Sequence, residues 1–225
     1  MVAVIIPAAG SGSRLGGLSK QMRLLGDAPM LLHTAQVFDQ HPAVSSLVVV
    51  GPPKNLNMIK GMLTPLKSPY QVVAGGVTRQ KSVEAGLKAV NESTSIVLIH
   101  DAARPFVSAQ IITKVIESTK IAGAAAVAMP VTDTVRYGEE GSFTKTISRD
   151  GLYAMQTPQG FKYDLLRRAF CQAAGVSQAT DDVSLMEHIG QSVRIVDGDR
   201  WNVKITTQSD WEWAQQVWEK KNLIR

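Results

Sequence analysis

The chain has 225 residues, of which 44% are hydrophobic and 19% are charged. This composition is typical of a globular protein and excludes collagen-like sequence, a coiled coil and a disordered chain. The length is sufficient to bury a large core, so we expect a single domain over residues 1–225. The 24 Lys and Arg against 19 Asp and Glu leave a net charge of +5, which suits either nucleic acid or a small phosphorylated substrate.

The chain has one cysteine, Cys171, which excludes an internal disulfide framework, and no run of Cys and His has the spacing of a zinc site. The N-terminal apolar stretch ends after six residues and carries no basic segment, unlike a signal peptide. No segment approaches the roughly 18 consecutive apolar residues of a membrane span. We therefore expect a cytoplasmic protein, or a stromal one if the source has plastids, with no membrane contact.

Short apolar runs alternate with helical spacings along the first 130 residues. The apolar runs predict strands at Val2–Ile6, Leu47–Val50, Val72–Ala74, Ile96–Ile99 and Ala124–Met129. The helical spacings predict helices at Leu31–Phe38, Leu56–Leu63, Val83–Val90 and, after a Ser108 cap, Ile111–Ile121. This alternation predicts an α/β fold, a Rossmann-like three-layer sandwich with a mostly parallel twisted sheet, whose ligands bind beyond the carboxyl ends of the strands.

The alternation stops after Pro130. Residues 131–158 are rich in Thr and Gly and lack apolar periodicity, so we predict a protruding two-stranded β-arm that turns at Glu139–Gly141. Because such a ribbon is marginally stable alone, we expect it to pack on a second copy of the chain. Farther on, the pattern predicts helices at Lys162–Ala174, Asp181–Ile189 and Thr207–Asn222, strands at Val193–Asp197 and Asn202–Ile205, and a capping box formed by Thr207 and Asp210.

A glycine-rich segment directly after the first predicted strand is the most informative motif. Small residues let the backbone pass close to a ligand, and free N–H groups in such a loop attract phosphate oxygens. The small residues are Pro7, Ala8, Ala9, Gly10 and Gly12, and the cations Arg14 and Lys20 follow them. A dinucleotide fingerprint needs glycine where Leu15 stands, and a P-loop needs a Gly-Lys-Ser/Thr sequence that is absent. The alternative is a flexible turn with two solvated cations.

Two further clusters follow predicted strands. Gly75 and Gly76 permit close backbone approach, and Arg79 and Ser82 share one face of the next helix, where they could contact a nucleotide. The alternative there is an ordinary turn before a capped helix.

The other cluster, at His100–Pro105, places a carboxylate at the end of a central strand. Asp101 could hold a divalent cation or a ligand hydroxyl, and Arg104 could grip a phosphate. An Asp101–Arg104 ion pair is the alternative. His100 is assigned to packing or to a backbone hydrogen bond, because no partner carboxylate pattern accompanies it.

The remaining polar candidates are scattered through the second half of the chain. They are Thr134, Arg149, Thr157, Thr180 and Lys204. Lys204 interrupts a predicted strand and is either a solvated edge lysine or a phosphate-facing one. Thr180, with Asp181 and Asp182, is also a good helix start. No Ser-His-Asp order, activated cysteine or zinc helix is present, so cations and glycines at strand ends favour phosphoryl or nucleotidyl transfer.

Together and in this order, the motifs resemble those of the 2-C-methyl-D-erythritol 4-phosphate cytidylyltransferases of the non-mevalonate isoprenoid pathway. The resemblance covers nearly the whole chain. It rests on Pro7–Arg14 with Lys20-Gln21, Gly75-Gly76 with Arg79 and Ser82, Asp101–Pro105, Pro130–Thr134, Arg149, Gln156–Gln159, Thr180-Asp181 and Asn202–Thr206. The family usually has Pro-Lys-Gln where this chain has Ser19-Lys20-Gln21.

The resemblance implies a reaction in which the phosphate of methylerythritol phosphate attacks the α-phosphorus of CTP and releases pyrophosphate. Arg14 and Lys20 would then stabilise the transition state together with Mg²⁺ or another divalent cation, which is held mostly by the CTP phosphates, with Asp101 as the candidate protein ligand. Nucleotide contacts would come from Pro7, Ala8, Ala9, Gly10, Gly12, Gly75, Gly76, Arg79, Ser82, Asp101 and Ala102. Contacts to the polyol phosphate would come from Arg149 and Lys204, helped by Asp101, Arg104, Thr134, Thr157 and Thr180.

In this family the arm reaches across a homodimer, so Thr134 and Arg149 would serve the partner's site. A close alternative function is ribitol 5-phosphate cytidylyltransferase, whose sequences share these motifs. Another is a non-catalytic nucleotide-binding protein, because a fold alone does not establish activity. Nucleic-acid binding is disfavoured, since the basic residues are scattered at strand ends rather than gathered on one helix.

Overall fold

The computed structural model describes residues 1–10, 20–172 and 181–223. Its main sheet has seven strands in the order β11-β7-β10-β6-β1-β4-β5. Pairing is parallel except at β10, which runs antiparallel to both of its neighbours. The strands are β1 (Val2–Pro7), β4 (Val44–Gly51), β5 (Tyr70–Ala74), β6 (Ile96–Ile99), β7 (Ala124–Pro130), β10 (Tyr153–Lys162) and β11 (Arg194–Asp197).

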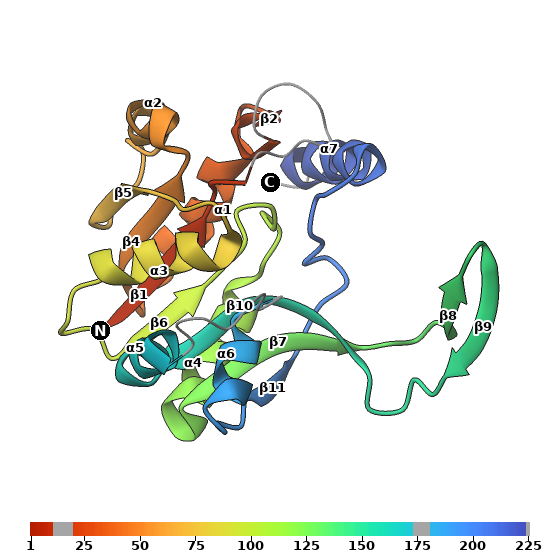
Figure 1. Ribbon diagram of the computed structural model, residues 1–225. Coiled ribbons are helices and arrows are strands. Elements are labelled where there is room, and N and C mark those ends of the chain that lie inside the picture. The colour runs from red at the N-terminus through yellow and green to blue at the C-terminus, as the bar shows by residue number, and fades with distance from the viewer. Residues whose placement is uncertain (11–19, 173–180, 224–225) are drawn as a thin grey trace.

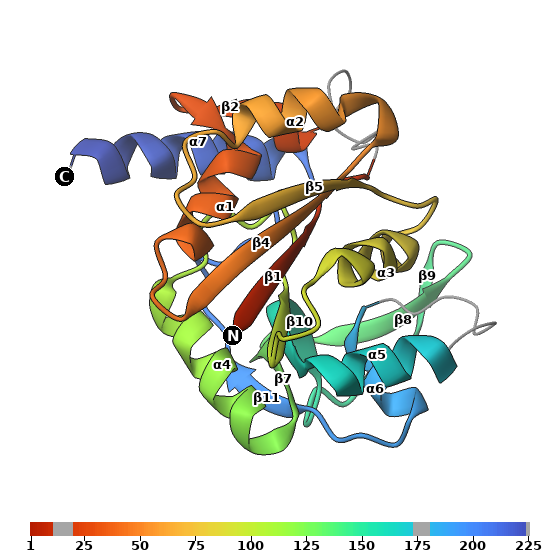
Figure 2. The same cartoon turned by 90° about the vertical axis from the view of Figure 1, so that its left-hand side faces the viewer.

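Helices cover both faces of this sheet, as Figure 2 shows. Side chains of α1, α2 and α4 pack on one face, and those of α3, α5 and α6 pack on the other. The helices are α1 (Met30–Asp39), α2 (Leu56–Met62), α3 (Arg79–Ala89), α4 (Ala109–Ala122), α5 (Tyr163–Gln172), α6 (Val183–His188) and α7 (Gln208–Leu223), with short 3-10 turns η2 (Lys20–Met22) and η3 (Pro53–Asn55). The predicted three-layer α/β sandwich is therefore confirmed.

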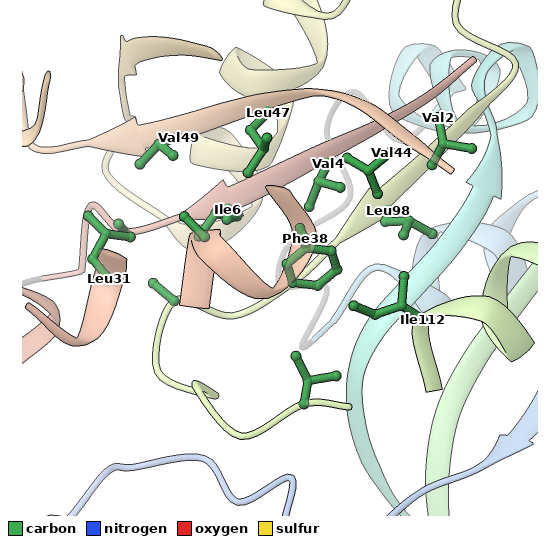
Figure 3. Packing of buried hydrophobic residues seen from close by; sticks show 14 of the residues in the cluster. Val2, Val4, Ile6, Leu31, Phe38, Val44, Leu47, Val49, Leu98 and Ile112 are labelled. Carbon is green, nitrogen blue, oxygen red and sulfur yellow. The ribbon is translucent and has the colours of Figure 1, made fainter. Parts of the chain in front are cut away.

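The two cores follow from the alternation of side chains along β1. Val4 and Ile6 lie in the cluster that contains Phe38 of α1 (Figure 3), whereas Ala3 and Ile5 lie in the cluster on the other face of the sheet. Phe38 is fully buried. Because both faces are covered, the strand is apolar at nearly every position, which is the pattern that the sequence shows.

The local signals at two helix starts are also confirmed. The Ser108 hydroxyl accepts a hydrogen bond from the Ile111 N–H at 3.3 Å and caps α4. Before α7, the Asp210 N–H donates to the Thr207 hydroxyl at 3.1 Å, and the Asp210 carboxylate accepts from the Thr207 N–H at 2.7 Å. These reciprocal bonds form the predicted capping box.

The arm is shorter than predicted. Strands β8 (Val135–Glu139) and β9 (Ser142–Ile147) form a separate two-stranded sheet that projects from the body of the molecule (Figure 1). Glu140 and Gly141 have positive φ angles of 49° and 80°, so the chain turns at the expected place. Residues 153–158, which we assigned to the arm, instead begin β10, and Tyr153–Met155 pair with β7 in the main sheet.

The apolar pattern of the sequence does not predict strand β10, because the middle of the strand is polar. Gln156, Thr157 and Gln159 interrupt any apolar run, and the pairing register with β7 shifts between Met155 and Gln159. These side chains are satisfied by hydrogen bonds to neighbouring segments rather than by apolar packing. Because the middle of β10 is polar, hydrophobic runs do not predict this strand.

The predicted strand at Asn202–Ile205 is wrong. This segment has no strand pairing and lies between β11 and α7 as an extended connection. The Ile205 N–H donates to the Ala103 carbonyl at 2.9 Å, and the Asn202 side chain donates to the Thr157 carbonyl at 2.8 Å. These two bonds attach the segment to the loop after β6 and to the middle of β10 at separate points, without the continuous pairing of a strand.

A second small hairpin pairs β2 (Leu24–Leu25) with β3 (Ala28–Pro29) next to α7.

In the described ranges, no helix combines the length and the hydropathy that crossing a bilayer requires.

Candidate active site

The candidate site lies at the edge of the sheet where β1, β5 and β6 end. Parallel strands place their carboxyl ends together, so the segments that follow them meet there. A Cβ atom on Gly75 would lie 2.5 Å from the Ala9 Cβ and 2.8 Å from the Ser82 hydroxyl oxygen. Only glycine allows this approach, and the two predicted glycine motifs are therefore in direct contact.

Asp101 is the centre of the charged part of the site. Its carboxylate lies 2.8 Å from Lys204 Nζ, 3.3 Å from Arg79 Nε and 3.7 Å from Arg104 Nε. Burial alone would raise the pKa of Asp101, but the cations Lys204 and Arg79 hold it well below its usual range. Asp101 is therefore a stable anion whose charge is matched by Arg104 in its own turn and by Arg79 and Lys204 from two distant segments.

Arg79 links Asp101 to a second buried carboxylate. Its Nη2 lies 2.7 Å from Asp182 Oδ2 at the start of α6, while its Nε faces Asp101. Burial opposes the charge of Arg79, but the two carboxylates raise its pKa and keep the guanidinium protonated. Asp182 is almost completely buried, and burial raises its pKa despite the neighbouring Arg79. The guanidinium thus joins α3, the end of β6 and α6.

His100 is a structural residue. Its Nε2 lies 3.0 Å from the Arg104 carbonyl, which can only accept, so Nε2 carries a proton. Burial lowers the pKa of His100 to about 4, so the ring is neutral and Nδ1 accepts a hydrogen bond from the Thr157 hydroxyl at 3.1 Å. The same hydroxyl accepts from the Asp101 N–H at 3.1 Å. The expected backbone hydrogen bond of His100 is confirmed, and this chain of bonds fixes the Asp101 backbone.

Arg104 fastens the segment that carries Lys204. Its Nη1 donates to the Asn202 carbonyl at 2.6 Å and its Nη2 to the Met155 carbonyl at 3.3 Å. The Arg104 side chain is 9% exposed, whereas that of Lys204 is 41% exposed. The ion pair between Asp101 and Arg104 is therefore present, and among the three cations around Asp101 it is Lys204 that reaches solvent most.

Comparison with known proteins identifies the family. A family model described as 2-C-methyl-D-erythritol 4-phosphate cytidylyltransferase matches residues 2–220. The chain belongs to this family. A relative of that name from Salinibacter ruber is 45% identical over 220 residues, which cover 96% of this chain and 92% of the relative. Another, from Bacillus velezensis, is 39% identical over 219 residues, covering 95% of this chain and 94% of the relative.

Solved structures agree. The 4-diphosphocytidyl-2C-methyl-D-erythritol synthase of Anaerococcus prevotii superposes with a TM-score of 0.86 at 28% identity, covering 97% of this chain and 96% of that one. The 2-C-methyl-D-erythritol 4-phosphate cytidylyltransferase of Thermus thermophilus superposes with a TM-score of 0.82 at 32% identity, covering 96% of this chain and 98% of that one. The likeness therefore extends over the whole chain.

Most of the residues singled out for this cytidylyltransferase family lie at or beside this edge. They are Pro7, Ala8, Ala9, Gly10, Gly75, Gly76, Arg79, Ser82, Asp101, Ala102, Arg104, Thr157 and Lys204. Thr134 and Arg149 lie instead at the exposed base of the arm, where an Arg149 nitrogen donates to the Thr132 carbonyl. Gly12, Arg14 and Thr180 lie outside the described residues, and of Lys20 only the backbone, in η2, is described.

Sequence reasoning gave no role to three residues that organise the site. Asn202 is fully buried and joins the Lys204 segment to Gln156 and Thr157. Gln159 accepts from the Asp182 N–H and donates to the Asp181 carboxylate. Gln21 binds the Ala8 and Gly10 carbonyls of the glycine-rich segment. The available signal for Asn202 was an amide side chain in a stretch whose apolar residues alternate with polar ones.

No group of three or more His, Cys, Asp or Glu side chains in the described ranges is arranged to hold a metal ion. Asp101 does offer the hard carboxylate oxygen that Mg²⁺ prefers, in a site whose remaining neighbours are cations. Its donor chemistry fits an ion whose other ligands come from phosphates and water.

Proposed function

We propose that this chain transfers the CMP group of CTP to the phosphate of 2-C-methyl-D-erythritol 4-phosphate, giving 4-diphosphocytidyl-2-C-methyl-D-erythritol and pyrophosphate for isoprenoid precursor synthesis. Family membership supports the reaction. The observation that carries the assignment of this site is the meeting of Lys204 and Arg79 at Asp101, directly beside the contact between the two glycine motifs. Two phosphorylated substrates need nearby cations to neutralise their charge, and accessible backbone to approach closely.

The reaction needs charge neutralisation more than proton transfer. A phosphate oxygen of the polyol forms a bond to the α-phosphorus of CTP, and the bond from that phosphorus to the pyrophosphate oxygen breaks. Since the attacking oxygen is already anionic, no strong general base is required. The neutral, fully buried His100 fits this scheme, because its ring nitrogens are occupied by structural hydrogen bonds.

We assign CTP to the glycine side of the site. The backbone of Ala8, Ala9 and Gly10, with Gly12, would contact its phosphates and ribose, and Gly75, Gly76 and Ser82 would line the other wall. Arg14 and Lys20 are proposed to neutralise the transition state at the α-phosphorus. The close contact of Ala9 with Gly75 supports a narrow pocket, which favours a pyrimidine over a purine by size.

We assign the polyol phosphate to the side of Lys204. Lys204 is the most exposed of the three cations around Asp101, so it can turn from that carboxylate to an incoming phosphate. Asp101 would then accept hydrogen bonds from polyol hydroxyls, helped by Thr157 and Thr180. Arg104, whose two terminal nitrogens bind backbone carbonyls, would support the phosphate site by holding the Lys204 segment.

A divalent cation, Mg²⁺ in our proposal, would be held chiefly by the CTP phosphates, with Asp101 as its protein ligand. When bound, the ion neutralises phosphate charge and orients the pyrophosphate leaving group.

The arm is proposed to form a homodimer and to bring Thr134 and Arg149 to the partner's site. Tyr137 and Phe143 on the arm are 62% and 80% exposed. A two-stranded ribbon with exposed aromatic side chains gains stability from a covering surface. We further propose that the enzyme works in the cytoplasm, which its lone cysteine supports.

The test is pyrophosphate release by the purified protein with CTP, Mg²⁺ and 2-C-methyl-D-erythritol 4-phosphate. Ribitol 5-phosphate serves as the second acceptor. We expect kcat/KM to be at least about tenfold higher for the methylerythritol substrate, which corresponds to about 1.4 kcal/mol of differential transition-state binding. If pyrophosphate is released with neither acceptor, the proposed function is wrong. If kcat/KM is higher for ribitol 5-phosphate, the acceptor is ribitol 5-phosphate and not the methylerythritol phosphate.

A further inference from the structure

A buried side-chain amide fastens the first loop of the site to the chain that returns from it. Gln21, which is 4% exposed, lies in the η2 turn. Its Nε2 donates to the Ala8 carbonyl at 2.8 Å and to the Gly10 carbonyl at 3.0 Å. Both acceptors are carbonyl oxygens, so the two protons of one NH₂ group account for both bonds.

This contact sets the direction of a backbone donor. In a planar trans peptide the C=O of one residue and the N–H of the next point in opposite directions. Because Gln21 holds the Ala8 carbonyl on its own side, the Ala9 N–H points away from Gln21. Among residues 1–10, 20–172 and 181–223, no acceptor takes a hydrogen bond from the Ala9 N–H, and Ala9 is partly exposed. A donor oriented in this way suits a ligand oxygen.

Gly75 makes a second contact with the same short segment. Its missing side chain lets Ala9 approach to a distance that a Cβ atom would prevent. The Ala8 N–H continues the sheet ladder by donating to the Val50 carbonyl at 2.7 Å. The backbone from Ala8 to Gly10 is therefore held from β4, from Gly75 and from Gln21.

The turn that carries Gln21 is itself anchored. Met22 is buried in the core cluster, and the Met30 N–H donates to the Arg23 carbonyl at 3.0 Å. In the hairpin that follows, Gly26 lies directly against the Trp218 ring of α7, and Figures 1 and 2 both show β2 beside α7. Gln21 thus lies in a segment that is attached both to the core and to α7.

We infer that Gln21 is a positioning residue for nucleotide binding: its amide orients the Ala8–Ala9 peptide so that the Ala9 N–H faces a phosphate or ribose oxygen of CTP. The inference rests on the proposed function for the identity of the nucleotide. It assigns Gln21 an effect on CTP and none on the polyol phosphate, because the two carbonyls that its amide holds belong to the segment after β1 and not to the Asp101 group.

The test replaces the amide while keeping its length. Gln21→Met removes both donors and keeps the packing, and Gln21→Glu places carboxylate oxygens against the two carbonyls. The matched controls are Gln71→Met and Gln71→Glu, which remove an exposed bond from Gln71 Nε2 to the Ala89 carbonyl at 3.2 Å. We expect the dissociation constant and the KM for CTP to rise about tenfold in both Gln21 variants, with the KM for the polyol phosphate unchanged within about twofold.

Calorimetric CTP binding is measured first, because it separates this inference from the proposed reaction. If the wild-type protein binds CTP but releases no pyrophosphate, the proposed function fails while the Gln21 comparison still decides the inference. Wild-type CTP affinity in Gln21→Met overturns the inference. So does an equal rise in both KM values, because that result indicates a general structural role. Urea unfolding of each variant identifies any loss of CTP affinity that is caused by partial unfolding of the protein.

Discussion

The Asp101 site and the β8–β9 arm are both built from polar stretches, yet their side chains are held very differently. Asp101 is 7% exposed and faces three cations, one from its own turn and two from distant segments. On the arm, between Val135 and Ile147, the one side-chain hydrogen bond that the structure records is the bond from the Thr144 hydroxyl to the Tyr137 carbonyl, at 3.5 Å. The side chains around Asp101 are therefore held in place by bonds within the chain, whereas those of the arm are exposed and make few such bonds.

The largest effect should come from the exposed cation of the site. Lys204→Ala removes the ammonium group proposed to bind the polyol phosphate, and we expect kcat/KM for that substrate to fall about 100- to 1000-fold. Its fold should survive, because Arg79 and Arg104 remain beside Asp101. Steady-state kinetics and a thermal melt measure the two effects.

The control for this variant is Lys88→Ala, which removes an exposed lysine paired with Glu84 at 2.9 Å on the surface of α3. Its kinetics should match the wild type. A Lys204→Ala enzyme with unchanged kcat/KM would remove Lys204 from the proposed phosphate site.

The second-largest effect should be a difference in the free energy of unfolding between variants of the Asp101 site and variants of the arm. Asp182→Asn removes the charge of a buried partner of Arg79, so we expect the free energy of unfolding to fall by about 3 kcal/mol. Asp133→Asn, near the start of the arm, alters an exposed carboxylate and should change that free energy by less than about 0.5 kcal/mol. Urea denaturation measures both. Equal losses in the two variants would show that the Arg79–Asp182 contact adds nothing beyond an exposed charge.

The same contrast explains what the sequence could predict. The strands buried on both faces and the helices between them follow from apolar periodicity, and β1 is an example: Val4 and Ile6 enter one core, while Ala3 and Ile5 enter the other. The parallel order then places the segments after β1, β5 and β6 at one edge. The position of the Asp101 cluster was predictable for that reason.

The missed parts are those in which polar side chains replace apolar packing. Strand β10 carries Gln156, Thr157 and Gln159, and Asn202 anchors a segment that has alternating apolar residues but no strand partner. The partners of these side chains lie tens of residues away in sequence. Local patterns carry no information about such bonds, so neither β10 nor the Arg79–Asp182 pair could be predicted from them.

The smallest effect on the folded monomer should come from the arm. Phe143→Ser removes an aromatic ring that is 80% exposed, so we expect the unfolding free energy measured at low protein concentration to change by less than about 0.5 kcal/mol. If the arm packs on a second copy, the same ring is buried in the dimer, and its loss should raise the dimer dissociation constant at least about tenfold. Sedimentation over a concentration series measures this shift. Ile121→Ser, which alters a 76% exposed residue on α4, is the matched control and should leave the dissociation constant unchanged.

An arm that orders only against a partner should make catalysis concentration-dependent in Phe143→Ser, because dilution would then withdraw Thr134 and Arg149 from the neighbouring site. Activity per chain that stays constant across the dissociation range would limit the arm to a role outside the reaction.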